Sequence, residues 1–157
     1  MIAVSDTSPL NYLVLTHCIH ILPALIDRVV VPQVVFDELS STAAPEEIRH
    51  WLANPPGWIE VQAFEGTDPL LKHLDPGERD AILLAESLNA DLILLDENRG
   101  REAARQRNLK MTGTLGLLNR AASQGLIDLS AALDLLTQTN FRVSPRLLQQ
   151  FKPRNPA

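Results

Sequence analysis

The chain has 157 residues, of which 45% are hydrophobic and 4% aromatic, with one cysteine and a net charge of −5. This length suits one compact domain. The single cysteine excludes an intrachain disulfide and a multi-cysteine zinc site, and the scarcity of rings argues against base stacking as the main mode of binding nucleic acid.

The overall negative charge also argues against a polyanionic partner, but the charge is unevenly divided. Residues 1–98 carry a balance of −12, whereas residues 99–157 carry +7. This asymmetry points either to a basic binding region or to acidic and basic helices that pair on an ordinary surface.

The beginning of the chain contains no basic segment and is interrupted by Asp6. No apolar run approaches the roughly 20 residues of a membrane span. We therefore expect a cytoplasmic protein with no targeting segment and no membrane partner.

Short β-branched or aliphatic runs alternate with helical patterns along the whole chain. Strands are predicted at Ile2–Val4, Val29–Val31, Trp58–Val61, Leu92–Leu95 and Lys110–Thr112. Continuous apolar strands are typical of a parallel sheet that is covered on both faces. The pattern predicts a three-layer α/β/α sandwich with a mostly parallel sheet of about five strands, in a domain over residues 1–150 that is followed by a frayed basic tail over residues 151–157.

Proline and glycine mark the predicted helix ends. Ser8-Pro9 and Ser144-Pro145 each put a capping hydroxyl before a proline at the first helical position. Asp75-Pro76-Gly77-Glu78 adds a capping box, so we expect a helix from Pro76 to about Asn89. Gly125 closes the helix that follows Thr114.

Asp6 and Asp96 each follow an apolar strand directly. In open parallel sheets the functional crevice lies beyond the carboxyl ends of the strands. Two carboxylates there repel each other unless a cation lies between them, and hard cations such as Mg²⁺ take oxygen ligands. Each aspartate could instead cap the helix that follows it; finding both at strand ends favours a metal site.

Two further acids lie on predicted helices. Glu38 comes four residues after Val34, on the edge of a buried stripe, and needs a partner there. Asp80 lies in the second turn of the Pro76 helix. Asp80 is favoured over Glu78 as the acid on the metal side, because the Glu78 side chain is expected to bond back to the N-cap amide in the capping box. Glu78 also lies near the positive end of the helix, can reach the same cleft and stays an alternative.

Four segments, in this order, resemble the PIN-domain family: Val4–Leu10, Val31–Leu39, Gly77–Ile82 and Leu94–Glu97. The likeness extends to a VapC-like subgroup of bacterial and archaeal proteins. In that subgroup Asp-Glu-x-Arg-Gly-Arg is followed by Thr-Gly-Thr-Leu-Gly, here residues 96–101 and 112–116.

The resemblance implies an acidic pocket for Mg²⁺ or Mn²⁺, in which the metal-binding and catalytic residues are Asp6, Glu38, Asp80 and Asp96. It further implies endonucleolytic hydrolysis of RNA by the toxin of a type II toxin–antitoxin pair. The implied partners are RNA, an antitoxin protein and a second copy of the chain.

Other residues are expected around these acids. The resemblance implies that Ser8 steadies Asp6 or a ligand water. Arg99 is expected to be the cation nearest to the metal and to hold a flanking phosphate. Thr114 either lines the cleft or caps a helix. Asn98 stands where many family members carry a further aspartate. Whether the pocket is fully anionic, and whether it holds a second metal, therefore stay open.

Other functions fit the sequence less well. A catalytically degenerate PIN fold that binds RNA or protein is the main alternative, although all four acids are present. A receiver-like signalling domain would need an acidic pair after the first strand, and a haloacid-dehalogenase phosphatase would need an aspartate where Ser8 stands.

Overall fold

The computed structural model of the chain describes residues 1–142 and Gln149. Its centre is a five-stranded sheet with the order β3-β2-β1-β4-β5. The strands are β1 (Ile2–Ser5), β2 (Arg28–Pro32), β3 (Ile59–Gln62), β4 (Leu92–Leu94) and β5 (Met111–Thr112). Neighbouring strands are parallel throughout, so the predicted strands and the parallel sheet are confirmed.

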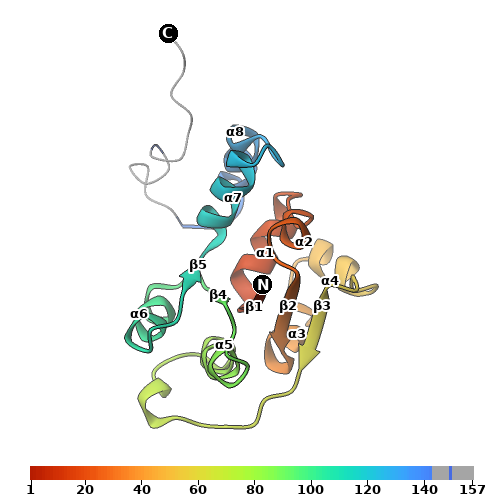
Figure 1. Ribbon diagram of the computed structural model, residues 1–157. Helices are drawn as coiled ribbons and strands as arrows, with labels where there is room; N and C mark the ends of the chain where they lie inside the picture. The colour runs from red at the N-terminus through yellow and green to blue at the C-terminus, as the bar shows by residue number, and fades with distance from the viewer. Residues whose placement is uncertain (143–148, 150–157) are drawn as a thin grey trace.

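Helices cover both faces of this sheet (Figure 1). Helices α5 (Pro76–Ser87) and α6 (Asn98–Gln106) lie on one face. The other face is covered by α1 (Thr7–Leu15), α2 (Ile21–Leu25), α3 (Gln33–Leu39), α4 (Glu46–Leu52), α7 (Thr114–Ser123) and α8 (Leu129–Thr137). Successive strand residues alternate between the two cores: Val29 and Val31 belong to one and Val30 to the other. This explains the continuous apolar strands, and the three-layer fold is confirmed.

The helix starts agree with the sequence in one case and differ in another. Helix α5 begins at Pro76, and its cap Asp75 accepts a hydrogen bond from the Glu78 amide at 2.9 Å, as predicted. Helix α1 begins at Thr7 with Asp6 at the N-cap position, so the predicted Ser8 cap is wrong. The Ser8 hydroxyl instead donates to a carboxylate from a distant part of the chain.

The order of the strands creates a switch point between β1 and β4. The chain passes from β1 to β2 on one side and later adds β4 on the other side. Ser5 pairs with Leu94 in the parallel register, and the Asp6 amide donates to the Leu94 carbonyl at 3.1 Å. Because ligands of open α/β sheets bind at such switch points, a site is expected at the edge beyond Ser5 and Leu94.

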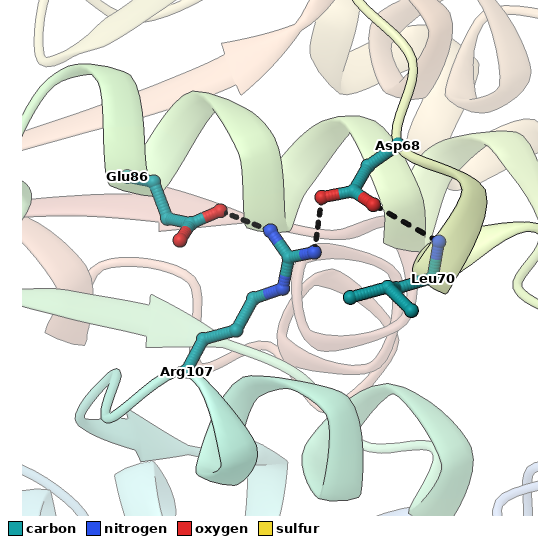
Figure 2. A network of polar contacts seen from close by, with 4 residues as sticks. All are labelled: Asp68, Leu70, Glu86 and Arg107. Atoms are coloured by element: carbon teal, nitrogen blue, oxygen red, sulfur yellow. Dashed lines mark hydrogen bonds and ion pairs between the residues drawn. The ribbon is translucent and has the colours of Figure 1, made fainter.

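The connection from β3 to α5 is held by an ion-pair network (Figure 2). Arg107, just after α6, donates to both Asp68 and Glu86. Asp68 also accepts from the Leu70 amide at 2.9 Å and caps the 3₁₀ turn η1 (Pro69–Leu71). Since Glu86 belongs to α5, one guanidinium ties together the connection, α5 and α6. The path of the chain toward Asp75, at the start of α5, is thereby fixed.

Two predictions fall outside the described residues: the helix start at Ser144-Pro145 and the frayed tail over residues 151–157. Within the described part, no helix is both long and apolar enough to cross a membrane.

Candidate metal and nucleic-acid site

Asp6 is a nearly buried carboxylic acid at the end of β1. Its residue is 5% exposed. Burial raises its pKa to about 8, the negative charges of Asp75, Glu78 and Glu38 add to the rise, and a hydrogen bond from the Thr7 amide opposes it. The Asp6 carboxylate also lies very close to the backbone of Gly77, at the start of α5. A Cβ atom added to this glycine would lie only 3.0 Å from Asp6 Oδ1. Asp6 therefore meets the first turn of α5.

Glu78 is the acid of α5 that is turned inward. It is 3% exposed, and its Oε2 is the buried side-chain atom without a hydrogen-bond partner in the described part of the chain. Burial raises its pKa to about 7, and the charges of Asp75 and Glu97 add to this, whereas Arg99 and the Asp75 backbone amide lower it. Of the predicted capping box, the hydrogen bond from the Glu78 amide to Asp75 Oδ1 is present, while Glu78 Oε2 stays without a partner.

Asp80, the acid favoured by the sequence, has a different environment. Its carboxylate Oδ1 accepts from Arg79 Nε at 3.3 Å, and its side chain is 14% exposed. It is not among the charges that act on Asp6, whereas Glu78 is. The structure thus turns Glu78 inward, with its charge acting on Asp6, and leaves Asp80 in an ion pair with its neighbour.

Glu38 lies at the same edge of the sheet but is exposed. Thr7, in the first turn of α1, donates its hydroxyl to Glu38 Oε2 at 3.0 Å. This is the partner that a carboxylate at the edge of a buried stripe requires. The neighbouring Asp37 accepts from Gln33 at 2.8 Å on the solvent side, so Glu38 is the one of the two that reaches the site.

Asp96 is held by three hydrogen bonds that come from two helices. Ser8 of α1 donates to Oδ2 at 2.7 Å, the Thr114 hydroxyl donates to Oδ2 at 2.7 Å, and the Thr114 amide donates to Oδ1 at 2.7 Å. The last bond places the carboxylate at the positive end of α7. A Cβ on Gly113 would lie 2.5 Å from Asp96 Oδ1, so this glycine is needed for the close approach.

Ser8 and Thr114 both make their side-chain contacts with Asp96. Ser8 supports Asp96, not Asp6, and Thr114 is fully buried and supports the same carboxylate. Asn98 and Arg99 are exposed in the first turn of α6. Arg101, in contrast, turns back and donates to the Leu95 carbonyl at 3.0 Å, which gives it a structural partner.

The carboxylates surround a small pocket of about 230 Å³, which we call the acidic pocket. Its acidic lining consists of Asp6, Glu38, Asp75 and Glu97, and Ser8 and Tyr12 form part of its wall. Asp96 lines the adjoining pocket, which shares Ser8, Tyr12 and Glu97 with the first. Three of the four predicted acids therefore meet around two connected pockets, and neither Asp80 nor the more deeply buried Glu78 is among the residues that line them.

Sequence reasoning missed Asp75, Glu97 and Tyr12 as parts of this site. Asp75 was assigned to capping alone, although its exposed carboxylate also faces the acidic pocket. Glu97 directly follows Asp96, which was a usable signal for a second acid at the same strand end. Tyr12 carried no signal, because only the packing of α1 brings it between the two pockets.

The donor set fits a hard divalent cation in part. Raised pKa values at Asp6 and Glu78, together with the unpartnered Glu78 Oε2, identify carboxylates that a cation would stabilise. Among the described residues, however, no three acidic, histidine or cysteine side chains lie close enough together to hold a metal directly. This suits Mg²⁺, which keeps several of its waters and is held by one or two carboxylates.

Comparison with known proteins agrees with this geometry. Residues 2–155 match the family described as "DUF3368: PIN domain". A PilT N-terminus domain protein from the hyperthermophilic archaeon Sulfolobus solfataricus P2 is similar in structure, with a TM-score of 0.57, 22% sequence identity, and 77% of this chain and 93% of that chain covered. This identity supports likeness of fold alone. No curated protein matches the chain. PIN domains are commonly nucleases and typically use divalent metals, and with nearly its whole length matched this chain belongs to the PIN-domain family.

Proposed function

We propose that this protein is a Mg²⁺- or Mn²⁺-dependent endoribonuclease. The observation that carries the proposal is the pair of buried carboxylic acids, Asp6 and Glu78, at the switch point of the sheet, both with strongly raised pKa values. Burying such groups destabilises the folded protein unless a ligand compensates. Family membership makes nuclease chemistry the natural reason for keeping them.

In this proposal Asp6 and Glu78 would hold the metal, and Glu38 and Asp75, whose charges act on Asp6, would help to orient water around it. A bound divalent ion would lower the pKa of a water and offset the charge of the phosphoryl oxygens. The oxygen of a water at the site would attack phosphorus, the bond from phosphorus to the leaving ribose oxygen would break, and that oxygen would take up a proton from solvent water. Glu38, exposed and oriented by Thr7, is suited to accept the proton of the attacking water.

Asp96 has a supporting role in this mechanism. Its oxygens accept from Ser8 and Thr114, so it is held rigidly between α1 and α7 at the edge of the pocket. From there it would orient a water at the site and keep the two helices in position. Arg99, which acts on the charge of Glu78, is near enough to the acids to offset the charge of a flanking phosphate.

The first experiment is cleavage of a mixed RNA substrate with Mg²⁺, with Mn²⁺ and with a chelator. Asp6→Asn and Glu78→Gln should each reduce the rate about 100-fold or more, as expected when several kcal/mol of metal-dependent stabilisation are lost. Matched controls are Asp80→Asn on the same helix and Asp37→Asn beside Glu38, and both should cleave almost as the wild type does. Equal cleavage by all variants, or cleavage in chelator, would contradict the metal site.

One observation favours a second candidate, a degenerate PIN fold that binds RNA or protein without cleaving. The described residues do not include three donors already gathered for a metal. This candidate predicts RNA binding without cleavage in either metal, and no increase in thermal stability on addition of Mg²⁺ or Mn²⁺ to the wild type.

We further propose that the nuclease is the toxin of a type II toxin–antitoxin pair, of the VapC-like subgroup, and that it forms a homodimer. Induced expression should then arrest growth of a bacterial host, and the Asp6→Asn variant should not. Co-expression of a small protein encoded beside the gene should restore growth. Normal growth on expression of active enzyme would contradict the toxin role. The homodimer is tested separately, by light scattering during size-exclusion chromatography.

A further inference from the structure

A second pocket adjoins the acidic one and differs from it in chemistry. It measures about 460 Å³, within the range of small-molecule sites. Tyr12 and Phe141 supply rings, Asn98 and Asn140 supply amides, and Arg142 supplies a cation. We call it the aromatic pocket. It is assembled from α1, the start of α6 and the segment after α8, which are distant from one another in the sequence.

The two rings of this pocket form an edge-to-face pair. Their centroids are 4.9 Å apart and their planes meet at 82°. In this arrangement one ring uses only its edge, so neither of its faces is covered by the partner ring. Both residues are half-buried and line the pocket. Both also pack against the core on their inner side, so the ring surface available to a flat ligand is the part that lines the pocket.

The polar groups are arranged to bind the edge of such a ligand. The Tyr12 hydroxyl donates to Asn140 Oδ1 at 2.7 Å, which orients the amide and leaves its N–H donors for a ligand. Asn98 supplies a second exposed amide. The carboxylate of Asp96, also at this pocket, is already occupied by Ser8 and Thr114.

The two pockets are also in contact with each other. Ser8, Tyr12 and Glu97 line both of them, so a molecule in the aromatic pocket lies directly beside one in the acidic pocket. Arg142 is the cation of the aromatic pocket and can bind a phosphate there. A stacked ring, hydrogen bonds at its edge and a nearby phosphate are the recognition features of a nucleotide.

We propose that the aromatic pocket binds the base of an unpaired ribonucleotide next to the phosphodiester that the acidic pocket holds. Its position relative to that phosphodiester rests on the nuclease function proposed above; the binding of a base does not. The low aromatic content of the chain does not oppose this inference, because one ring pair at the right position is enough for one base.

Nucleotide binding tests the proposal without metal and without cleavage. The probes are AMP, GMP, CMP and UMP, with ribose 5-phosphate as the matched ligand that lacks a base, titrated in chelator and followed by NMR. At least one nucleotide should bind about 5-fold or more tightly than ribose 5-phosphate, the lower bound for one stacked base. The amide signals that shift should include those of Tyr12, Asn140 and Phe141.

Variants separate stacking from edge recognition. Phe141→Leu keeps an apolar side chain against Tyr12 but removes the ring, and should weaken the best nucleotide about 5-fold or more. Asn140→Ala should weaken the same nucleotide several-fold while leaving ribose 5-phosphate unchanged. Asn54→Ala, an exposed asparagine in the turn before β3, is the matched control and should bind like the wild type.

The outcomes also distinguish this proposal from the nuclease proposal. If ribose 5-phosphate binds as tightly as all four nucleotides, or if the shifted signals lie away from the aromatic pocket, the base site is wrong even when RNA is cleaved. If one nucleotide binds with the expected dependence on Phe141 and Asn140 but no metal supports cleavage, the base site stands and the nuclease function fails.

Discussion

Replacing Asp6 by asparagine keeps the size of a buried side chain and removes its ionisation. The folded-state pKa of Asp6 is raised from 3.8 to about 8, so its contribution to stability is fully present below pH 3.8 and is lost as the pH rises through 8. Each pH unit between these values costs the wild type about 1.4 kcal/mol relative to the variant. By pH 7 this loss of stability in the wild type amounts to about 4 kcal/mol relative to the variant. The cost of burying the asparagine amide in the variant, about 1 to 3 kcal/mol, is subtracted from this advantage.

Urea unfolding in chelator, from about pH 4 to about pH 9, measures this difference. Asp6→Asn should gain stability over the wild type as the pH rises, and the exposed Asp37→Asn should not. Saturating Mg²⁺ should then favour the wild type, by about 2.7 kcal/mol at 100 times its dissociation constant. A difference between Asp6→Asn and wild type that does not change with pH would refute the assignment of Asp6 as a destabilised buried acid.

Two further substitutions test the support of the site. Gly113→Ala puts a Cβ 2.5 Å from the Asp96 carboxylate and should cost about 1 to 3 kcal/mol in urea unfolding as well as most of the RNA cleavage; Gly57→Ala, which meets nothing within 4 Å, should cost neither, and equal behaviour of the two would contradict the close approach. Arg107→Ala breaks the network of Figure 2 and should lower the urea midpoint more than Arg105→Ala, whose ion pair with Glu102 is exposed; equal midpoints would show that the network adds nothing.

Much of the fold could be predicted from the sequence because its signals are local. The Leu92–Leu94 run and the Val29–Val31 run are apolar at every position, which only a doubly covered strand requires. The start of α5 was predictable from Asp75-Pro76 because its cap is local: the Asp75 carboxylate accepts a hydrogen bond from the Glu78 amide, three residues later. The Ser8-Pro9 prediction was wrong because its hydroxyl had a competing acceptor, Asp96, 88 residues away in the sequence.

The candidate site was less predictable, and Glu78 and Asp80 illustrate why. Two residues apart on an α-helix, at about 100° per residue, they point in nearly opposite directions. The sequence locates both in the first turns of α5, but only the packing of α5 against β1 and β2 decides which carboxylate is turned inward. The aromatic pocket lay beyond sequence reasoning altogether, because Tyr12 and Asn140 are 128 residues apart.

By itself, then, the sequence determined that this protein is a parallel α/β domain with aspartates directly beyond two of its strands, since strand burial and chain continuity are local properties. The tertiary structure alone decided that those two strands are neighbours. It also decided that Glu78 is turned inward without a full set of partners, and that a ring pair lies beside the acids. These depend on the sheet order and on helix packing, which bring together residues that no local pattern connects.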